Sequence, residues 1–299
     1  GILLSLLILR RPQAFQKMKI AISGVGGQLG SFFSSQLKHA GEFFDGYSRE
    51  DWNILSRKDS ENILASGKYD ILINCAAYTD VEKAETDQTS CIDINACALK
   101  HLSEQCRRHG ILFVHFSTDY IFDGMSQKPY QETDKPNPIN IYGASKLEGE
   151  QIIQASGCRY LIGRLSWLFG GKDSGFTSKL QKWRDEHKVL KITSDEVSAP
   201  TFAGHVPNVI LSAVEKNLEG IFHINNSGSC SRYEWARYFA EQNNWSNSII
   251  KPALMSSFKT QARRPGFSVM CNKKFQTICR KPIPEWKLAV KESIQEKIQ

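Results

Sequence analysis

Tyr142 and Lys146, in the stretch YGASK, carry a phenol and an ammonium four residues apart. On a helix the two side chains lie on the same face and can contact each other. A free phenol has a pKa of about 10, and a nearby ammonium favours the phenolate and lowers that pKa. Tyr142 is therefore a candidate general acid for a carbonyl oxygen, with Lys146 as the partner that adjusts its pKa. The alternative is a surface pair on an amphipathic helix.

A carbonyl substrate also needs a group that holds its oxygen. The sequence STDY, residues 117–120, follows an apolar run and offers Ser117 or Thr118 for this purpose. Both hydroxyls come at the end of a predicted strand, where ligands of parallel sheets bind. The residues themselves do not distinguish between the two.

A glycine-rich turn follows the first apolar run, KIAIS. Gly24, Gly27 and Gly30 allow a tight turn, close approach of a pyrophosphate and close packing of helix on strand. The helix that follows presents free N–H groups and a positive dipole end to an anion. The sequence therefore predicts a dinucleotide site, and the alternative is a tight turn without a ligand. The spacing is GxxGxxG and not the GxGxxG of two-domain dehydrogenases.

The end of the second predicted strand, GYSRE, bears on the choice of cofactor. Arg49 favours the 2′-phosphate of NADPH, because an arginine here accommodates that group. Asp51 lies close enough to favour the ribose hydroxyl of NADH, so NADH stays an alternative. Arg49 is otherwise a solvated surface charge.

Alternating strands and helices must position these groups. Apolar runs predict strands at 19–23, 43–47, 69–77, 111–118 and 159–166, with helices at 31–41, 90–110 and 142–156 between them. This alternation predicts an α/β fold, a Rossmann-type doubly wound parallel sheet with a smaller C-terminal substrate domain. We expect an NAD(P)-binding domain at 18–168. Residues 169–299 are expected to be mainly substrate-binding, with some segments returning to the first domain. The shorter elements at 200–202, 220–228 and 262–268 are expected to belong to this smaller domain.

Composition and charge exclude several classes of protein. The chain carries a net charge of +7, but its basic residues are scattered and form no stripe with aromatics, so we expect no nucleic-acid partner. The apolar run near the start is too short to span a bilayer, and we expect no membrane partner. Residues 1–17 are expected to be an extension outside the fold. The eight cysteines form no CxxC, which indicates buried thiols in a reducing cytoplasm and no zinc site.

A longer series of motifs narrows the interpretation. NCAAYTDVEKAE, INA, FSTDYIFDG, YGASKLEGE, RLSWLF, APT, RRPGFS and IPEW occur in this order between residue 18 and about residue 290. The chain resembles the extended short-chain dehydrogenase/reductases, and within them the dTDP-4-dehydrorhamnose reductase family. The resemblance implies NADPH-dependent reduction of the C4 ketone of dTDP-4-dehydro-L-rhamnose to dTDP-L-rhamnose. The partner implied is a dTDP-linked keto-sugar.

The resemblance also implies roles for individual residues. The implied catalytic residues are Thr118, Tyr142 and Lys146. The implied cofactor-binding residues are Gly24, Gly27, Gln28, Leu29, Gly30, Arg49, Ala76, Ala77, Tyr78, Tyr142 and Lys146. The implied substrate-binding residues are Val81, Thr118, Asp119, Tyr120, Trp167 and Arg264. Arg264 suits the diphosphate because arginine binds phosphate with two parallel hydrogen bonds. Trp167 is alternatively a core residue, and Arg264 a surface charge.

Departures from the family pattern leave alternatives open. Asn53, Leu165 and Ser198 replace an aspartate, a threonine and a glycine that are common in the family, and they touch the adenosine and loop regions. One alternative is a reductase for another nucleotide-linked 4-keto-6-deoxy sugar. Another is a non-catalytic NADP-binding regulatory subunit, like the beta subunit of methionine adenosyltransferase. The resemblance also implies a homodimer and bound Mg²⁺ as possibilities. No carboxylate cluster in the sequence supports a metal site.

Overall fold

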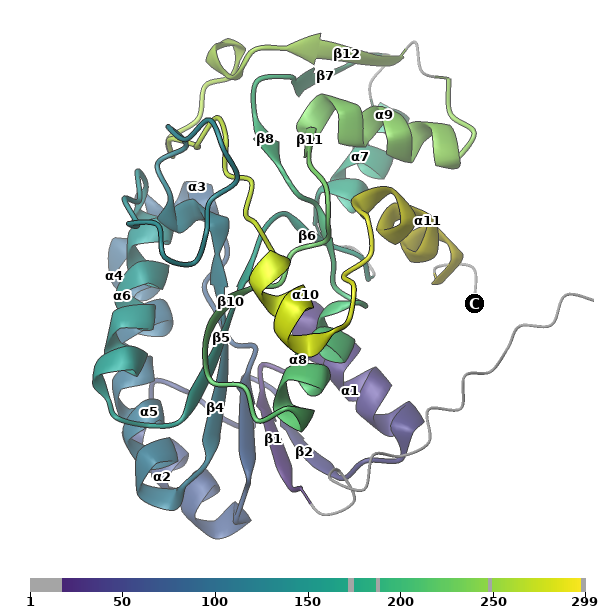
Figure 1. Cartoon of the computed structure of the whole chain (residues 1–299). Coiled ribbons are helices and arrows are strands. Elements are labelled where there is room, and N and C mark those ends of the chain that lie inside the picture. Colours follow the sequence, from purple (N-terminus) through teal and green to yellow (C-terminus); the bar gives the residue numbers. More distant parts are fainter. Residues whose placement is uncertain (1–17, 172–174, 187–188, 247–248, 297–299) are drawn as a thin grey trace, which may run out of the picture.

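A six-stranded parallel sheet forms the centre of the protein (Figure 1). The computed structural model describes residues 18–171, 175–186, 189–246 and 249–296, so the expected extension at 1–17 lies outside the described residues. The strand order is β10 (Gly220–His223), β5 (Tyr160–Leu165), β4 (Leu112–Thr118), β3 (Ile71–Asn74), β1 (Ile20–Ser23) and β2 (Phe44–Tyr47). The five strands predicted from apolar runs are confirmed. Most of their ends lie within one or two residues of the predicted positions.

Both faces of this sheet are buried, which explains why its central strands are apolar without alternation. Ile20 and Ile22 of β1 pack in one cluster, whereas Ala21 between them packs in another. Helices α1 (Gln28–Ala40), α8 (Val206–Glu215) and α10 (Lys273–Cys279) supply residues to the first cluster. Helices α2 (Arg57–Gly67), α5 (Ala98–His109) and α6 (Ile141–Ala155) supply residues to the second.

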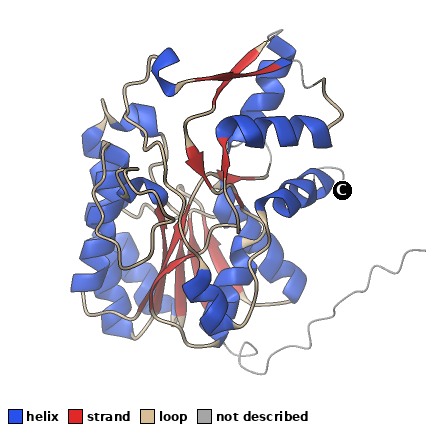
Figure 2. Cartoon of the chain, turned by 45° about the horizontal axis from the view of Figure 1, so that its top comes forward, coloured by secondary structure: helices blue, strands red, loops and turns tan. Residues whose placement is uncertain are grey.

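A smaller region lies above the carboxyl ends of the strands (Figures 1 and 2). It contains three two-stranded sheets, formed by β6 (Leu168–Phe169) with β9 (Thr201–Phe202), β7 (Leu190–Thr193) with β12 (Ile250–Ala253), and β8 (Val197–Ser198) with β11 (Cys230–Ser231). Its helices are α7 (Gly175–Glu186), α9 (Arg232–Gln242) and α11 (Trp286–Glu296). An aromatic core with Phe169, Trp235 and Trp286 holds these pieces together, separately from the two clusters of the main sheet.

Short elements connect the strand ends to the helices. They are α3 (Val81–Ala84), α4 (Gln88–Ile92), the π-helical η2 (Asp93–Cys97), and the 3₁₀ turns η3 (Asp119–Ile121) and η5 (Met255–Ser257). The single helix predicted at 90–110 is therefore interrupted, since η2 separates α4 from α5. Such π segments often mark functional sites. Among the described residues, no helix has both the length and the apolar character needed to cross a membrane.

Two expectations from the sequence were wrong. We assigned 220–228 to the smaller region, but β10 joins the main sheet, where it pairs with β5 in parallel. Its four residues follow helix α8, so the chain makes one more crossover before it returns to the smaller region. We also expected buried thiols, and Cys97 is exposed on η2. All eight cysteines are free.

A buried ion pair fastens α6 to the sheet. Arg164 of β5 contacts Glu150 of α6 through two hydrogen bonds of 2.9 and 2.7 Å, and both side chains are almost fully buried. The guanidinium also lies 3.3 Å from His223, its neighbour on β10. Removal of one member of a buried pair leaves an uncompensated charge, whereas exposed pairs contribute little.

We predict that Glu150→Ala lowers the free energy of unfolding by about 3–5 kcal/mol, because Arg164 is left charged and buried. The matched control is Glu219→Ala, which removes the exposed partner of Arg159 at 2.7 Å on the neighbouring loop. We expect the control to cost less than about 1 kcal/mol. Urea denaturation measures both variants, and equal losses would contradict the assignment of Arg164–Glu150 as the structural pair.

Candidate functional site

Helix α6 brings Tyr142 and Lys146 to the carboxyl ends of the strands. Its first turn is fixed by Asn140, whose side chain accepts from the backbone N–H of Gly143 at 2.7 Å. The backbone N–H of Ile141 donates to Glu85 at 2.9 Å. Both bonds satisfy donors that a helix start leaves free. The first turn of α6 is therefore held from two sides.

Two glycines allow α6 to approach its neighbours closely. A Cβ atom at Gly143 would lie 2.1 Å from the carbonyl oxygen of Tyr120, and one at Gly149 would lie 2.2 Å from that of Asn95. Neither distance is sterically possible, so only glycine permits this packing. The close approach places Tyr142 and Lys146 beside the end of β4.

Lys146 is buried, with 2% of its surface exposed. Burial lowers the pKa of its ammonium to about 8, although the charges of Glu150 and Cys91 act in the opposite direction. Its Nζ atom lies 3.2 Å from Nε2 of His115 on β4. The lysine is thus held by the sheet beneath it.

Tyr142 has a raised pKa, and burial is the main cause. A hydrogen bond with Thr118 lowers the pKa, while the charges of Asp119 and Cys91 raise it further. The protein groups around Tyr142 therefore do not by themselves produce the lowered pKa that we expected from Lys146. Desolvation of the phenolate outweighs the effect of a lysine that is directed toward His115.

Thr118 is the hydroxyl that the structure brings to Tyr142. It ends β4, donates to Asp119 at 3.2 Å and accepts from the backbone N–H of Tyr120 at 3.2 Å. The side chain of Ser117 is buried, and its Oγ has no hydrogen-bond partner among the described residues. Of the two hydroxyls left open by the residues alone, only that of Thr118 acts on the phenol, whose pKa it lowers.

The glycine turn has the shape that a dinucleotide requires. Gly24 adopts a left-handed φ of 72°, and a Cβ atom there would lie 2.7 Å from the backbone nitrogen of Ala76. A Cβ atom at Gly30 would lie 2.3 Å from the carbonyl oxygen of Gly24. Helix α1 starts after Gly27 with no side-chain cap and no acid in its first turn. Its free N–H groups and positive dipole end fit a phosphate.

The neighbouring residues that we expected to bind the cofactor differ in their surroundings. Gln28 donates to the carbonyl of Gly170 at 2.7 Å, and the side chain of Leu29 packs in the core. β3 ends at Asn74, so residues 76–78 lie in the loop after it, although the predicted strand extended to residue 77. Tyr78 is half-buried, and its hydroxyl donates weakly to Asp87 at 3.4 Å. The glycine turn and the loop after β3 thus lie side by side at Ala76.

The turn after β2 separates Arg49 from Asp51. The Asp51 carboxylate accepts from the backbone N–H and the hydroxyl of Ser48, at 3.0 and 2.7 Å. Arg49 is exposed, and no hydrogen bond or ion pair ties its side chain to the described part of the chain. Because Asp51 is engaged within its own turn and Glu50 is negatively charged, Arg49 is the basic group that this turn offers to an anionic ligand.

Asn95 lies in the candidate site, although no role was predicted for it from the sequence. Its amide accepts from the backbone N–H of Tyr78 at 2.9 Å and donates to the Tyr78 carbonyl at 3.0 Å. It also donates to Ser145, the residue before Lys146, at 3.0 Å. Asn95 therefore joins the loop after β3 to α6. The INA motif contains Asn95 and could have pointed to it. The motif does not show that Asn95 bonds Tyr78 and Ser145.

The residues expected around the sugar lie near the end of β4 and in the smaller region. Asp119 is buried and accepts from Ser198 and Ser268, at 3.1 and 2.5 Å. The side chain of Tyr120 packs edge-on against Tyr142, with ring centroids 6.1 Å apart. Ser198, noted as a departure from the family pattern, thus supplies a bond to Asp119. That bond could not be foreseen from the sequence.

Arg264 is held at the same edge by an ion pair. Its guanidinium lies 2.6 Å from Glu82, the residue after Val81. Glu82 also accepts from the backbone N–H of Gln261 at 2.8 Å, and Asn140 donates to the carbonyl of Arg263 at 2.8 Å. The RRP segment is therefore fastened to the start of α6 and to α3. Arg264 is close enough to Tyr120 for the phenol to influence the pKa of its guanidinium.

Trp167 carries backbone strain and is covered by an arginine. Its φ is 45°, which a tryptophan rarely adopts and which often marks a functional site. The guanidinium of Arg232 lies 3.8 Å from the ring centroid, and Arg232 pairs with Glu196 at 3.4 Å. Glu196 accepts a long bond of 3.5 Å from the hydroxyl of Tyr120. Arg232 and Glu196 were missed from the sequence because they are 36 positions apart.

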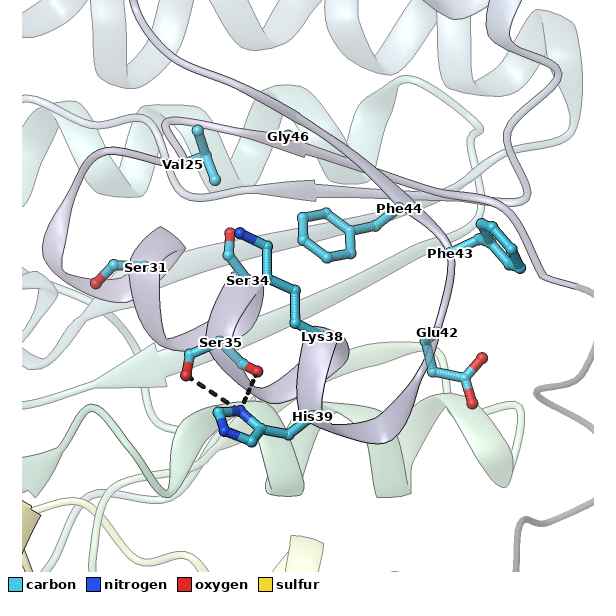
Figure 3. A pocket seen from close by; sticks show the side chains of 10 residues that line it. All are labelled: Val25, Ser31, Ser34, Ser35, Lys38, His39, Glu42, Phe43, Phe44 and Gly46. Atoms are coloured by element: carbon cyan, nitrogen blue, oxygen red, sulfur yellow. Dashed lines mark hydrogen bonds between the residues drawn. The ribbon is translucent and has the colours of Figure 1, made fainter. Parts of the chain in front are cut away.

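A separate hollow of about 780 Å³ lies on the outer edge of the sheet. Figure 3 shows it between α1 and the segment that enters β2, with Lys38, Phe44 and Val25 among its lining residues. His39 lines it as well and is turned back to Ser35 on the same helix. None of the candidate catalytic residues lines this hollow, so it is distinct from the site on α6.

No group of three or more potential metal ligands lies together in the described portion of the chain.

Comparison with known proteins gives a consistent relationship. The profile described as the RmlD substrate binding domain matches residues 18–298. A dTDP-4-dehydrorhamnose reductase of Burkholderia thailandensis is 31% identical, over 91% of this chain and 97% of its own length. One from Mycobacterium tuberculosis is 30% identical, over 91% of each chain.

Solved structures give the same result. A dTDP-4-dehydrorhamnose reductase of Bacillus anthracis in complex with NADP superposes with a TM-score of 0.90, at 28% identity, over 94% of this chain and 99% of its own. A structure from Clostridium acetobutylicum superposes with a TM-score of 0.89 at 32% identity, over 94% of this chain and all of its own.

The buried carboxyl of Asp119 makes the stability of the protein depend on pH. Burial raises its pKa from the ordinary 3.8 to about 6. The group's contribution to the free energy of unfolding is therefore complete below about pH 4 and is lost as pH rises through about 6. Asp119→Asn removes this loss. We compare the free energy of unfolding of Asp119→Asn with that of wild type, measured by urea denaturation. From pH 4 to pH 7 we expect this difference to change by about 2–3 kcal/mol in favour of the variant.

The control is Asp123→Asn. Hydrogen bonds, that from Asn137 first, lower the pKa of Asp123, so its contribution is present above the unfolded pKa and is lost as pH falls. The control variant should therefore show the opposite trend. A difference between wild type and Asp119→Asn that does not change with pH would contradict the raised pKa.

Proposed function

The chain belongs to the family of the RmlD substrate binding domain, and from this premise we propose that it is a dTDP-4-dehydrorhamnose reductase. It is an NADPH-dependent oxidoreductase that reduces the C4 ketone of dTDP-4-dehydro-L-rhamnose to dTDP-L-rhamnose, in dTDP-rhamnose biosynthesis. The observation that carries the proposal is the meeting of Tyr142, Lys146 and Thr118 at one edge of the sheet, next to the glycine turn.

NADPH fits the residues of the glycine turn. The turn at Gly24 and Gly30 leaves no room for a Cβ atom, and the uncapped start of α1 provides N–H donors for a pyrophosphate. Arg49 supplies positive charge for a 2′-phosphate, since Asp51 is engaged by Ser48. The Bacillus anthracis relative is described in complex with NADP. When bound, the cofactor supplies the hydride that reaches C4.

We assign the proton transfer to Tyr142. Its phenol donates a proton to the substrate oxygen as that oxygen gains charge, and Thr118 holds the same oxygen through its hydroxyl. Lys146 lies on the same face of α6 and favours the phenolate left behind. Burial makes the phenol a weaker acid, and Lys146 counteracts this by favouring the phenolate. We also assign to Lys146 a bond to a cofactor ribose.

We assign the sugar and nucleotide contacts to residues around this triad. Val81, Tyr120 and Trp167 border the substrate, and Arg264 binds its diphosphate in place of Glu82. An arginine paired with a carboxylate has the geometry that phosphate also requires. Val81 and Tyr120 follow strands of the main sheet, whereas Arg264 comes from the segment beyond η5. We assign cofactor binding to the main sheet with its helices.

We predict that Tyr142→Phe loses most turnover, roughly 10²–10⁴-fold, and keeps its affinity for NADPH, because only the proton donor is removed. The assay follows NADPH oxidation with dTDP-4-dehydro-L-rhamnose generated in situ, and NMR identifies the product. Tyr130→Phe is the control, since its hydroxyl bonds Ser126 and Asp123 and has no assigned role in turnover. Undiminished turnover in Tyr142→Phe would refute the assignment.

Arg49→Ala tests the cofactor preference. We expect the KM for NADPH to rise about tenfold, equivalent to about 1.4 kcal/mol, with the KM for NADH within about twofold of wild type. Arg49→Lys keeps a charge and should give a smaller rise. Equal changes for both cofactors would show that Arg49 does not contact a 2′-phosphate.

A further inference from the structure

Three buried polar side chains lie in a row beneath α6, and the proposed mechanism uses none of them. Ser23, Asn74 and His115 lie on β1, β3 and β4, and each is about 1% exposed. The strand register places Ser23 opposite Asn74, and Asn74 opposite His115. We refer to these three residues as the polar row. They face α6, because the residues two positions earlier on each strand pack in the cluster of α5 and α6, namely Ala21, Leu72 and Phe113.

The polar row is joined by hydrogen bonds and ends at Lys146. The hydroxyl of Ser23 lies 2.7 Å from Oδ1 of Asn74, and Nδ2 of Asn74 lies 3.1 Å from Nδ1 of His115. Nε2 of His115 lies 3.2 Å from Nζ of Lys146. The backbone N–H of Ala76, in the loop after β3, also donates to Oδ1 of Asn74 at 3.2 Å.

The donors and acceptors of the polar row admit one arrangement of hydrogens. The N–H of Ala76 can only donate, so the atom of Asn74 that faces it is the oxygen. The amide NH₂ of Asn74 therefore faces His115, and Nδ1 of His115 must accept. A neutral imidazole then carries its hydrogen on Nε2, which is directed at Lys146. An ammonium has no lone pair to accept it, whereas a neutral amine has one.

We infer that His115 is a positioning residue that holds Lys146 through an Nε2–H donor and couples the proton on Lys146 to the polar row. When Lys146 gains a proton, Nε2 must become the acceptor and the imidazole hydrogen must move to Nδ1. That hydrogen then faces the NH₂ of Asn74, so the amide must rotate. Rotation breaks the bond from Ala76, which lies in the proposed cofactor loop.

The other groups that face Lys146 do not remove this coupling. Glu150 of α6 and Cys91 of α4 both favour the ammonium, but Glu150 is already bound by Arg164 through two hydrogen bonds. Burial keeps the pKa of His115 well below its ordinary value, so its imidazole stays neutral at working pH. The inference rests on the proposed function only for its effect on turnover.

The first experiment records the nitrogen-15 shifts of the histidine rings in the full-length protein. At pH 9.5 we expect His115 to be neutral with its hydrogen on Nε2, and on lowering the pH through about 8 to convert to the Nδ1–H form. His115→Gln identifies the signal. His223 is an internal control, because Arg164 donates to its Nε2 and Cys271 accepts from its Nδ1, so it keeps the opposite tautomer. An Nδ1–H form or an imidazolium at pH 9.5 overturns the inference.

The second experiment reverses the polar row. Asn74→Asp places an acceptor beside Nδ1 of His115, which frees Nε2 to accept from the ammonium. We expect the alkaline limb of the pH profile of kcat/KM to move up by about one pH unit or more. The double variant Asn74→Asp/His115→Gln keeps the carboxylate charge without the imidazole and should shift less. Equal shifts, or none, overturn the inference. An inactive wild type would refute the proposed function. The nitrogen-15 shifts would still decide whether His115 holds Lys146 as inferred.

Discussion

The close approach of α6 to its neighbours is the constraint on which the site depends. Gly143 and Gly149 permit contacts with the backbones of Tyr120 and Asn95 that any side chain would prevent. The approach brings a phenol and an ammonium from one helix face to the end of β4. The Arg164–Glu150 pair then fixes the helix to the sheet from within. A small displacement of α6 would separate Tyr142 from Thr118 and Lys146 from His115.

Burial has opposite consequences for the two groups that α6 presents. It disfavours the charged form of each, so the pKa of Tyr142 rises and that of Lys146 falls to about 8. The phenol of Tyr142 is therefore protonated at neutral pH, while Lys146 approaches the pH range in which it can exchange a proton. The polar row beneath Lys146 extends this balance to the loop that we assign to the cofactor. In the mechanism we propose, proton transfer and cofactor binding therefore share the same buried hydrogen bonds.

The smaller region contributes by fastening its segments to the same edge. Ser198 and Ser268 hold the carboxyl of Asp119, and Glu82 holds Arg264. Arg232 covers the ring of Trp167 and pairs with Glu196. These contacts join residues that are far apart in the chain, and they place charged and aromatic groups around the end of β4. The main sheet holds α6, the helix to which we assign the chemistry.

The sequence by itself determined the parallel sheet, most strand positions, the glycine turn and the Tyr142–Lys146 pair, because all of these follow from local spacing. Apolar runs must be buried, glycine permits tight turns, and residues four apart share a helix face. Only the tertiary structure decided that β10 joins the main sheet, and that His115 and Asn95 contact the lysine helix. Those outcomes depend on strand register and on the direction of buried side chains, which arise when distant segments pack together.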